Sequence, residues 1–176
     1  VAKNMIEECC RLGVKHLTLF AFSTENWLRP QAEVSFLMRL LRRQLRKERQ
    51  SLIDNNIRFR CIGDISRLPQ PVQSEISLAL KETRGCTGMN LVFALSYGGR
   101  QELTHAVQRL AQDIQDGYLK ADSIDENIIE SYMESSFLPN PDLIIRTSGE
   151  SRLSNFYLWQ AAYSEFVVTE KYWPEF

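Results

Sequence analysis

Residues 89–100 read MNLVFALSYGGR, and this stretch decides the fold. Its first seven residues are almost wholly apolar, which predicts a strand that is buried on both faces. Two glycines, Gly98 and Gly99, follow the polar pair Ser96 and Tyr97. They predict a turn into a helix over residues 100–115, which Gly117 ends. A buried strand that runs directly into a helix is typical of α/β proteins.

The same alternation continues on both sides of this stretch. Apolar runs predict four more strands, at residues 16–22 (HLTLFAF), 57–62, 142–146 (DLIIR) and 165–169 (EFVVT). Helical patterns predict helices over residues 1–12, 31–55, 71–83 and 125–134. Short apolar strands that alternate with helices indicate an α/β fold with a largely parallel central sheet flanked by helices.

Length and composition limit the class of protein. The chain has 176 residues, which predicts one domain over residues 1–176. Its net charge of −1 argues against a nucleic-acid partner. Four cysteines without CxxC spacing and two isolated histidines argue against structural zinc. Scattered thiols suit a reducing cytosol, so a cytoplasmic location is predicted.

Polar side chains gather where the predicted strands end. In parallel α/β sheets, ligands bind at the carboxyl ends of the strands. Arginine forks match phosphate oxygens, and hydroxyls and helix N-terminal amides complete such a site. The pattern therefore predicts a phosphorylated ligand. The residues at these strand ends are Ser23, Glu25, Asn26, Arg29, Ser96, Tyr97, Arg146, Thr147, Ser148, Gly149, Glu150, Arg152, Ser154 and Asn155.

Common catalytic motifs are missing from the sequence. It contains no GxxxxGK[ST] loop, no GxGxxG fingerprint and no GxSxG elbow. Proton transfer is therefore left to a carboxylate, an amide, water or the substrate. Aromatic residues flank the same loops, and they are interpreted either as ordinary core or as an apolar pocket for a lipid diphosphate. These aromatic residues are Phe22, Trp27, Phe36, Phe156 and Trp159.

Charge is distributed unevenly along the chain. Residues 39–60 hold eight basic and two acidic side chains, a net charge of +6. A solvated helix face is the favoured interpretation. The alternative is a peripheral contact with an anionic membrane, and with it membrane association of a cytoplasmic protein.

Four motifs carry a resemblance to a known family. They are LTLFAFSTENWLRP (17–30), IRFRCIGDISRLP (57–69), LVFALSYGGRQEL (91–103) and residues 141–176, which include RTSGESRLSNFYLWQ. In order and spacing they resemble the cis-prenyltransferases, the undecaprenyl and dehydrodolichyl diphosphate synthases. The resemblance implies a Mg²⁺-dependent transferase of isoprenoid biosynthesis. Such an enzyme condenses isopentenyl diphosphate onto an allylic diphosphate such as farnesyl diphosphate, giving a medium-to-long polyprenyl diphosphate. It also implies a homodimer and an apolar tunnel between sheet and helices.

The resemblance assigns roles residue by residue. Asn26 matches the proton-handling residue, and because a neutral amide is a poor base we interpret it as an orienter of substrate or of a proton path. Glu165 matches a magnesium-binding carboxylate. Substrate contacts are implied for Ser23, Thr24, Glu25, Trp27 and Arg29, and isopentenyl diphosphate contacts for Arg146, Arg152, Leu153 and Ser154.

The sequence also departs from the family pattern. The MDGN-type segment with its magnesium aspartate does not precede Val1, and the final helix does not follow WPEF. We therefore expect the domain to be incomplete at both ends and the chain as given to be inactive alone, because Mg²⁺ needs several oxygen ligands. The alternative function is a non-catalytic partner subunit of a heteromeric enzyme. Intact FSTENWxRP and RTSGExRLS motifs favour the enzyme. Phe36, bulkier than the usual residue at its position, is a candidate to shorten the product.

Overall fold

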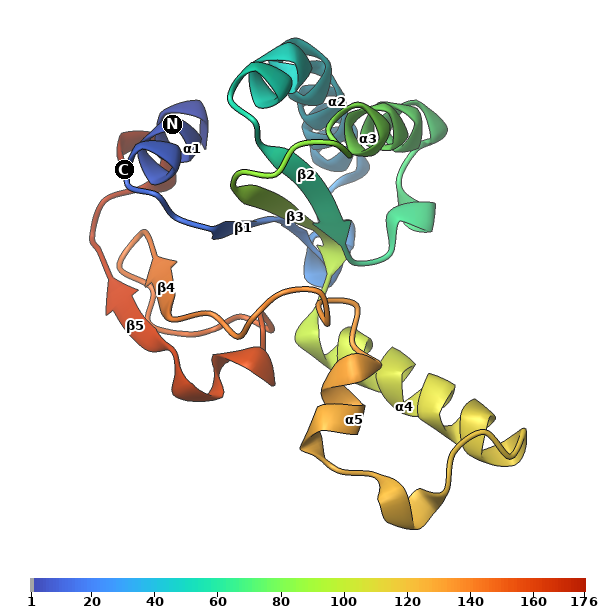
Figure 1. The fold of residues 1–176 in the computed structure, drawn as a ribbon. Helices are drawn as coiled ribbons and strands as arrows, with labels where there is room; N and C mark the ends of the chain where they lie inside the picture. Colours follow the sequence, from blue (N-terminus) through green and yellow to red (C-terminus); the bar gives the residue numbers. More distant parts are fainter. Residues whose placement is uncertain (1) are drawn as a thin grey trace. The chain divides into compact units, whose positions relative to one another are not determined.

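The computed structural model describes residues 2–176, which divide into two compact units, Ala2–Tyr97 and Gly98–Phe176. Each unit contains helices and a small parallel sheet (Figure 1). The five predicted strands are all present, and every pairing among them is parallel. The predicted α/β class is therefore confirmed. The single domain over residues 1–176 stays a prediction.

The first unit is built on a three-stranded sheet. Its strands are β1 (His16–Ser23), β2 (Arg58–Ile62) and β3 (Asn90–Tyr97), in the order β1-β3-β2. Leu91 of β3 pairs with Leu17 on one side and Phe59 on the other. From Leu91 to Tyr97, every residue of β3 except Phe93 is buried. This agrees with the apolar run that predicts the strand.

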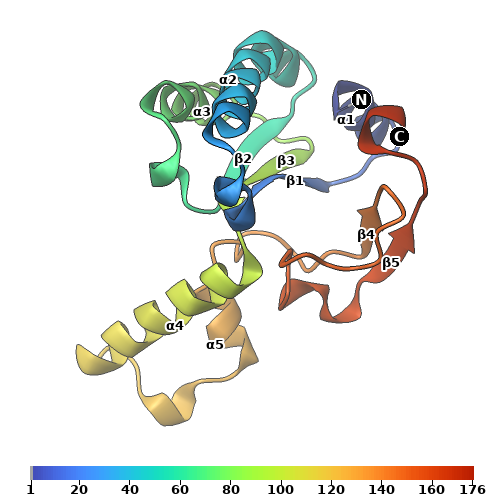
Figure 2. The same ribbon diagram turned by 180° about the vertical axis from the view of Figure 1, so that it is seen from behind.

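Helices cover this sheet and close the core. They are α1 (Ala2–Arg11), α2 (Gln31–Asp54) and α3 (Gln70–Glu82), each within two residues of its predicted bounds. Helices α2 and α3 pack side by side over one face of the sheet, as both views show (Figures 1 and 2). Val34 and Met38 of α2 and Val72 and Ile76 of α3 lie in this core. Burying these side chains is the main source of stability of the unit.

The second unit holds a two-stranded sheet and two helices. The strands are β4 (Leu143–Arg146) and β5 (Glu165–Val168), and the helices are α4 (Gly99–Gln115) and α5 (Glu126–Ser131). Helices α4 and α5 contact each other. The prediction that the strands are covered on both faces is wrong for this pair. Phe166, Val167 and Val168 are 37%, 47% and 39% exposed, because no helix of the unit packs over β5.

Helix α5 is shorter than predicted. The pattern predicts a helix to residue 134, but α5 ends at Ser131. Its last turns tighten, since the backbone N–H groups of Tyr132 and Met133 donate to carbonyls three residues back. The N–H of Ser135 then donates to the carboxylate of Glu102, 3.0 Å away on α4. A tertiary hydrogen bond therefore replaces the next helical one.

Short 3₁₀ helices link the larger elements. They are η1 (Thr24–Leu28), η2 (Ile65–Arg67), η3 (Ala121–Ser123), η4 (Gln160–Tyr163) and η5 (Trp173–Glu175). No helix within residues 2–176 is both long and apolar enough to cross a membrane.

Candidate active site

The residues that follow β1 fold into η1, and Asn26 fixes the start of this turn. The backbone N–H of Ser23 donates to Oδ1 of Asn26 over 3.0 Å. This hydrogen bond uses the only acceptor group of the amide and sets its orientation. Across the described chain, Nδ2 of Asn26 has no hydrogen-bond partner. The amide NH₂ of Asn26 is therefore left available as a donor, and its role as an orienter stays a prediction.

Trp27, the next residue, is held by three contacts. Its indole Nε1 donates to Oγ of Ser96 at the end of β3, 2.9 Å away. Its ring meets the edge of Phe22, with centroids 4.9 Å apart. The guanidinium of Arg67 lies 5.1 Å above the ring. The sequence predicts Ser96 at this edge but gives no signal for Arg67, which reaches Trp27 from η2.

The remaining polar residues of this loop are tied to near neighbours. Thr24 donates to the Glu25 carboxylate over 3.1 Å. Arg29 forms an ion pair with Glu33 one helical turn later, and its side chain is half exposed. Arg29 is therefore accessible to an anion, which would compete with Glu33 for the guanidinium.

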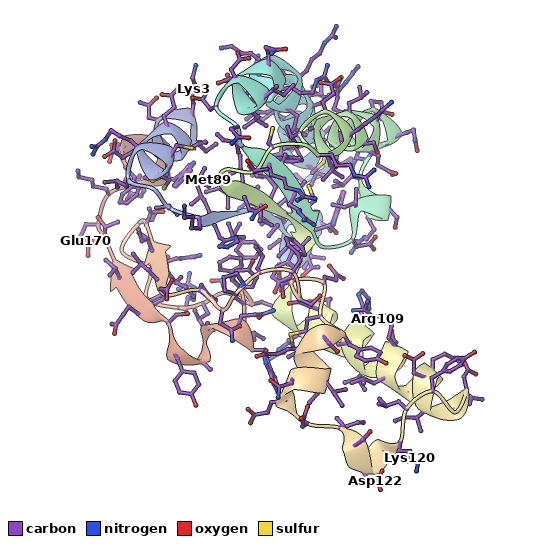
Figure 3. All side chains as sticks on the ribbon, in the orientation of Figure 1. Lys3, Met89, Arg109, Lys120, Asp122 and Glu170 are labelled. Atoms are coloured by element: carbon purple, nitrogen blue, oxygen red, sulfur yellow. The ribbon has the colours of Figure 1, made fainter. Side chains whose placement is uncertain are left out.

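In the second unit, backbone hydrogen bonds join the loop after β4 to the residues after β5. The N–H of Ser148 donates to the carbonyl of Lys171, and that of Gly149 donates to the carbonyl of Thr169, each over 2.9 Å. Gly149 has φ +66°, and a Cβ there would lie 2.6 Å from the carboxylate of Glu170. Glu170 is labelled just beyond β5 in Figure 3. Glycine adopts this positive φ without strain, and the two backbone hydrogen bonds hold the loop against the residues after β5.

Arg146 and Ser154 come together as the sequence predicts. Nη2 of Arg146, the last residue of β4, donates to Oγ of Ser154 over 3.4 Å. Nε of Arg146 is buried and has no hydrogen-bond partner within residues 2–176. A buried guanidinium N–H without a partner is costly, and an anionic oxygen would satisfy it. This pair is the strongest candidate for a phosphate contact.

Arg152 and Leu153 are the other two residues predicted to contact isopentenyl diphosphate, and neither joins the Arg146–Ser154 contact. Arg152 is 70% exposed and forms an ion pair with Glu150, two residues earlier. Leu153 is partly buried. Arg152 therefore sits at the surface of the unit, whereas Arg146 lies deeper.

Two of the N-terminal amides of α4, which the sequence predicts to help bind phosphate, already have hydrogen-bond partners. The N–H of Gly99 donates to the carbonyl of Asn155 over 2.7 Å. The N–H of Arg100 donates to Oδ1 of the same residue over 2.9 Å. Asn155 thus acts as a cap supplied from a distant segment, and it uses amides that would otherwise be open to a ligand.

The described residues do not form a magnesium site. Glu165, the predicted ligand, is an exposed side chain at the start of β5. No group of three His, Cys, Asp or Glu side chains that could hold a metal ion occurs in the part of the chain that the structure describes. A single carboxylate supplies only part of the octahedral set of oxygen ligands of Mg²⁺, so water and substrate phosphate oxygens would have to supply the rest.

Thiol chemistry is also disfavoured. Burial raises the pKa of the Cys61 thiol to about 12. Burial raises the pKa values of Cys9 and Cys10 as well. These cysteines stay protonated at neutral pH and are poor nucleophiles.

The aromatic residues divide between core and surface. Phe22 is buried in the core, where Trp27 packs against it. Phe156 stacks on Tyr157 with ring centroids 4.4 Å apart, and Trp159 donates to Glu130. Phe36 is 57% exposed on α2 and is not part of the core.

The basic face of α2 is partly neutralised. Arg49 forms ion pairs with Glu75 and Glu82 of α3, over 3.0 and 2.8 Å. Arg42 lies 4.0 Å from the same Glu75 carboxylate. The arginines that stay exposed without a described ion pair are Arg39, Arg43 and Arg46.

The parallel strands, with helices and polar loops between them, define the chain as an α/β protein. The family model described as "Putative undecaprenyl diphosphate synthase" matches residues 1–176. The chain belongs to this family.

Relatives and solved structures agree with this assignment. The chain is 52% identical to an isoprenyl transferase of Geobacter sulfurreducens, over 98% of this chain and 70% of the relative. It is 45% identical to an isoprenyl transferase of Clostridium perfringens, over 99% and 69%.

Two solved structures have the same fold. Lavandulyl diphosphate synthase from Lavandula x intermedia, in complex with dimethylallyl diphosphate, matches with a TM-score of 0.95 and 40% identity, over 97% of this chain and 74% of that one. A "probable undecaprenyl diphosphate synthase" from Campylobacter jejuni matches with a TM-score of 0.86 and 35% identity, over 99% and 80%. The chain is accordingly classed as a prenyltransferase.

Proposed function

We propose that the protein elongates prenyl chains by condensing isopentenyl diphosphate onto an allylic diphosphate such as farnesyl diphosphate, forming a medium-to-long polyprenyl diphosphate with cis double bonds. The observation that carries this proposal is the Arg146–Ser154 pair, in which the buried guanidinium Nε–H has no hydrogen-bond partner among the described residues. Membership of a family whose relatives are isoprenyl transferases gives that anion its chemical class.

The reaction needs stabilisation of charge and does not need a nucleophilic side chain, because the isopentenyl double bond is itself the nucleophile. The bond between the allylic carbon and the diphosphate oxygen breaks, and diphosphate leaves with the electron pair. The isopentenyl double bond supplies the electrons of the new carbon–carbon bond, and a proton is then lost. Positive groups that bind both diphosphates lower the energy of such a charge-separated transition state.

Each loop has a part in this proposal. Arg146 binds the isopentenyl diphosphate with Ser154, and Arg152 and Leu153 complete its site. Asn26 donates its amide to substrate and orients it, because its Oδ1 is held by Ser23. Trp27, Arg29 and the residues 23–25 contact the allylic substrate.

The metal, the assembly and the location are the less direct parts of the proposal. We also propose Mg²⁺ as cofactor, to which Glu165 would contribute one carboxylate. The described side chains do not complete such a site, so no step of the reaction is assigned to the ion. We also propose a homodimer in the cytoplasm.

The direct test is a turnover assay of the intact protein with radiolabelled isopentenyl diphosphate, farnesyl diphosphate and Mg²⁺, with products resolved by chain length. We expect elongated polyprenyl diphosphates, and their loss on chelation of the metal. Replacing Arg109 with alanine is the control, since this arginine lies on an exposed face of α4. Absence of any elongated product from the intact protein would contradict the proposal and favour a non-catalytic subunit.

A further inference from the structure

The segment that follows the Arg146–Ser154 contact has an unusual backbone. Within residues 153–160, three non-glycine residues have positive φ: Ser154 at 51°, Asn155 at 62° and Tyr157 at 46°. Side chains with a Cβ disfavour this region, and it persists only where the surroundings hold it. What holds the 153–160 segment therefore also determines where the Ser154 hydroxyl lies.

The first anchor of the 153–160 segment is Asn155. Its Oδ1 accepts the N–H of Arg100 over 2.9 Å, and its Nδ2 donates to Oε1 of Gln101 over 3.1 Å. Its carbonyl also accepts the N–H of Gly99. The Asn155 side chain, directly after Ser154, thus caps one backbone N–H at the N-terminus of α4 and also binds the Gln101 side chain.

The second anchor is a buried polar cluster at the other end of the segment. Nε2 of Gln160 donates to the carboxylate of Glu102 over 2.8 Å, and both residues are buried, at 7% and 2% exposed. Ser135 donates to the same carboxylate through its N–H and its hydroxyl, over 3.0 and 2.7 Å. A buried carboxylate with several donors is tightly fixed, so this end of the segment is rigid.

We propose that Asn155 is a positioning residue for diphosphate binding, which holds the Ser154 hydroxyl against Arg146 by tying the 153–160 segment to α4. This inference rests on the proposed function, because it assumes that Arg146 and Ser154 bind the isopentenyl diphosphate. With the Gln160 end fixed by Glu102, loss of the Asn155 side chain leaves Ser154 free to leave the left-handed region. Its hydroxyl then turns away from the guanidinium.

The test compares binding and stability in three variants of the intact protein. Asn155→Gly keeps the positive φ accessible and removes the side-chain hydrogen bonds to Arg100 and Gln101. Asn155→Asp keeps the acceptor for the Arg100 N–H. Asp125→Ala is the matched control, because Asp125 caps α5 in the same unit by accepting the N–H of Ile128 over 2.8 Å. Isopentenyl diphosphate binding is measured by calorimetry without the allylic substrate, and Tm is measured in parallel.

We expect Asn155→Gly to weaken isopentenyl diphosphate binding on the order of 10-fold, since small displacements of a binding group are costly. In turnover, KM for isopentenyl diphosphate rises while KM for farnesyl diphosphate stays within twofold. Asn155→Asp recovers most of the affinity, and Asp125→Ala lowers Tm with no change in affinity.

Two results would overturn the proposal in distinguishable ways. If wild-type protein binds isopentenyl diphosphate and Asn155→Gly binds it equally well, Asn155 has only a structural role. If the wild-type protein neither binds nor elongates isopentenyl diphosphate, the proposed function fails and this inference fails with it.

Discussion

The indole Nε1 of Trp27 donates a 2.9 Å hydrogen bond to the hydroxyl of Ser96, which joins the turn after β1 to the end of β3. Ser96 is buried and adopts φ +50°, in the left-handed region that non-glycine residues rarely enter. Trp27 therefore depends for its orientation on a strained neighbour 69 positions away.

Two replacements of Ser96 separate the effect of the hydrogen bond to Trp27 from the effect of the strained backbone. Ser96→Ala leaves the indole N–H without its acceptor and keeps the strained backbone, so we expect a loss of about 1–3 kcal/mol in the free energy of unfolding. Ser96→Gly removes the same acceptor but relieves the strain, which offsets roughly 1 kcal/mol of that loss. Urea denaturation measures both values.

Enzyme kinetics test what the Trp27–Ser96 contact does. If this contact positions Trp27 for the allylic substrate, both Ser96 variants raise KM for farnesyl diphosphate to a similar degree. A rise in only the less stable variant would mean that stability, and not the position of Trp27, controls the effect.

Replacing Asn26 distinguishes the role of its amide oxygen, which accepts a hydrogen bond, from the role of its amide nitrogen, which donates one. Asn26→Asp keeps the oxygen that accepts the Ser23 N–H, so we expect Tm to stay within a few degrees of wild type. It replaces the amide donor with a carboxylate facing an anionic substrate. We expect kcat to fall by at least about 100-fold, as on removal of a donor that stabilises a transition state.

In contrast to Asn26→Asp, we expect Asn26→Ala to lower the stability of the protein. It removes the acceptor for the Ser23 N–H and costs about 1 kcal/mol, typical of a lost cap. Its kcat also falls, because the donor is gone. A variant Asn26→Asp with wild-type kcat would show that the amide donor has no part in the reaction.

The sequence predicts the fold well where one local pattern decides it. Apolar runs predict β1 to β5 to within two residues, and glycine and proline positions predict the helix bounds. The pairing of Arg146 with Ser154 is also predictable, because only eight positions separate them and Arg146 ends the strand that the loop of Ser154 follows.

Contacts between distant segments could not be predicted in this way. The Asn155 side chain caps α4 from 55 positions away, and no periodicity or spacing records such a contact. The same holds for Arg67 above Trp27 and for Glu102, which takes the Ser135 N–H and so ends the helical pattern after α5 early. Periodicity and spacing report only on residues that are close together in the sequence.

Arg146 provides the most direct test of the phosphate contact. Arg146→Ala removes a guanidinium that is held at Ser154, and a charge-assisted hydrogen bond contributes about 1.5–3 kcal/mol. We expect KM for isopentenyl diphosphate to rise between about 10-fold and 100-fold, with an unchanged circular dichroism spectrum. Arg146→Lys recovers little, because an ammonium cannot bind two oxygen atoms as a fork does. Wild-type kinetics in Arg146→Ala would refute the assignment.

The exposed arginines of α2, Arg39, Arg43 and Arg46, recur at helical spacing and so project from one side of the helix. In contrast, Arg49 is paired with Glu75 and Glu82 and is not available to a surface. Because the proposed product is a lipid, we propose that the three exposed arginines contact an anionic membrane. The favoured alternative from the sequence, a solvated face, makes the opposite prediction.

Vesicle sedimentation distinguishes the membrane contact from a solvated face. Each basic residue near an anionic surface contributes about 1 kcal/mol, so glutamine at all three exposed arginines of α2 should reduce partitioning onto phosphatidylglycerol vesicles on the order of 100-fold. Binding should also fall as salt is added, and pure phosphatidylcholine vesicles should bind neither protein. The control variant carries glutamine at three exposed basic positions elsewhere, Lys81, Arg84 and Lys120, and so has the same net charge. Equal loss in both variants would mean that only net charge matters, and no binding by the wild-type protein would leave the face of α2 as solvated surface.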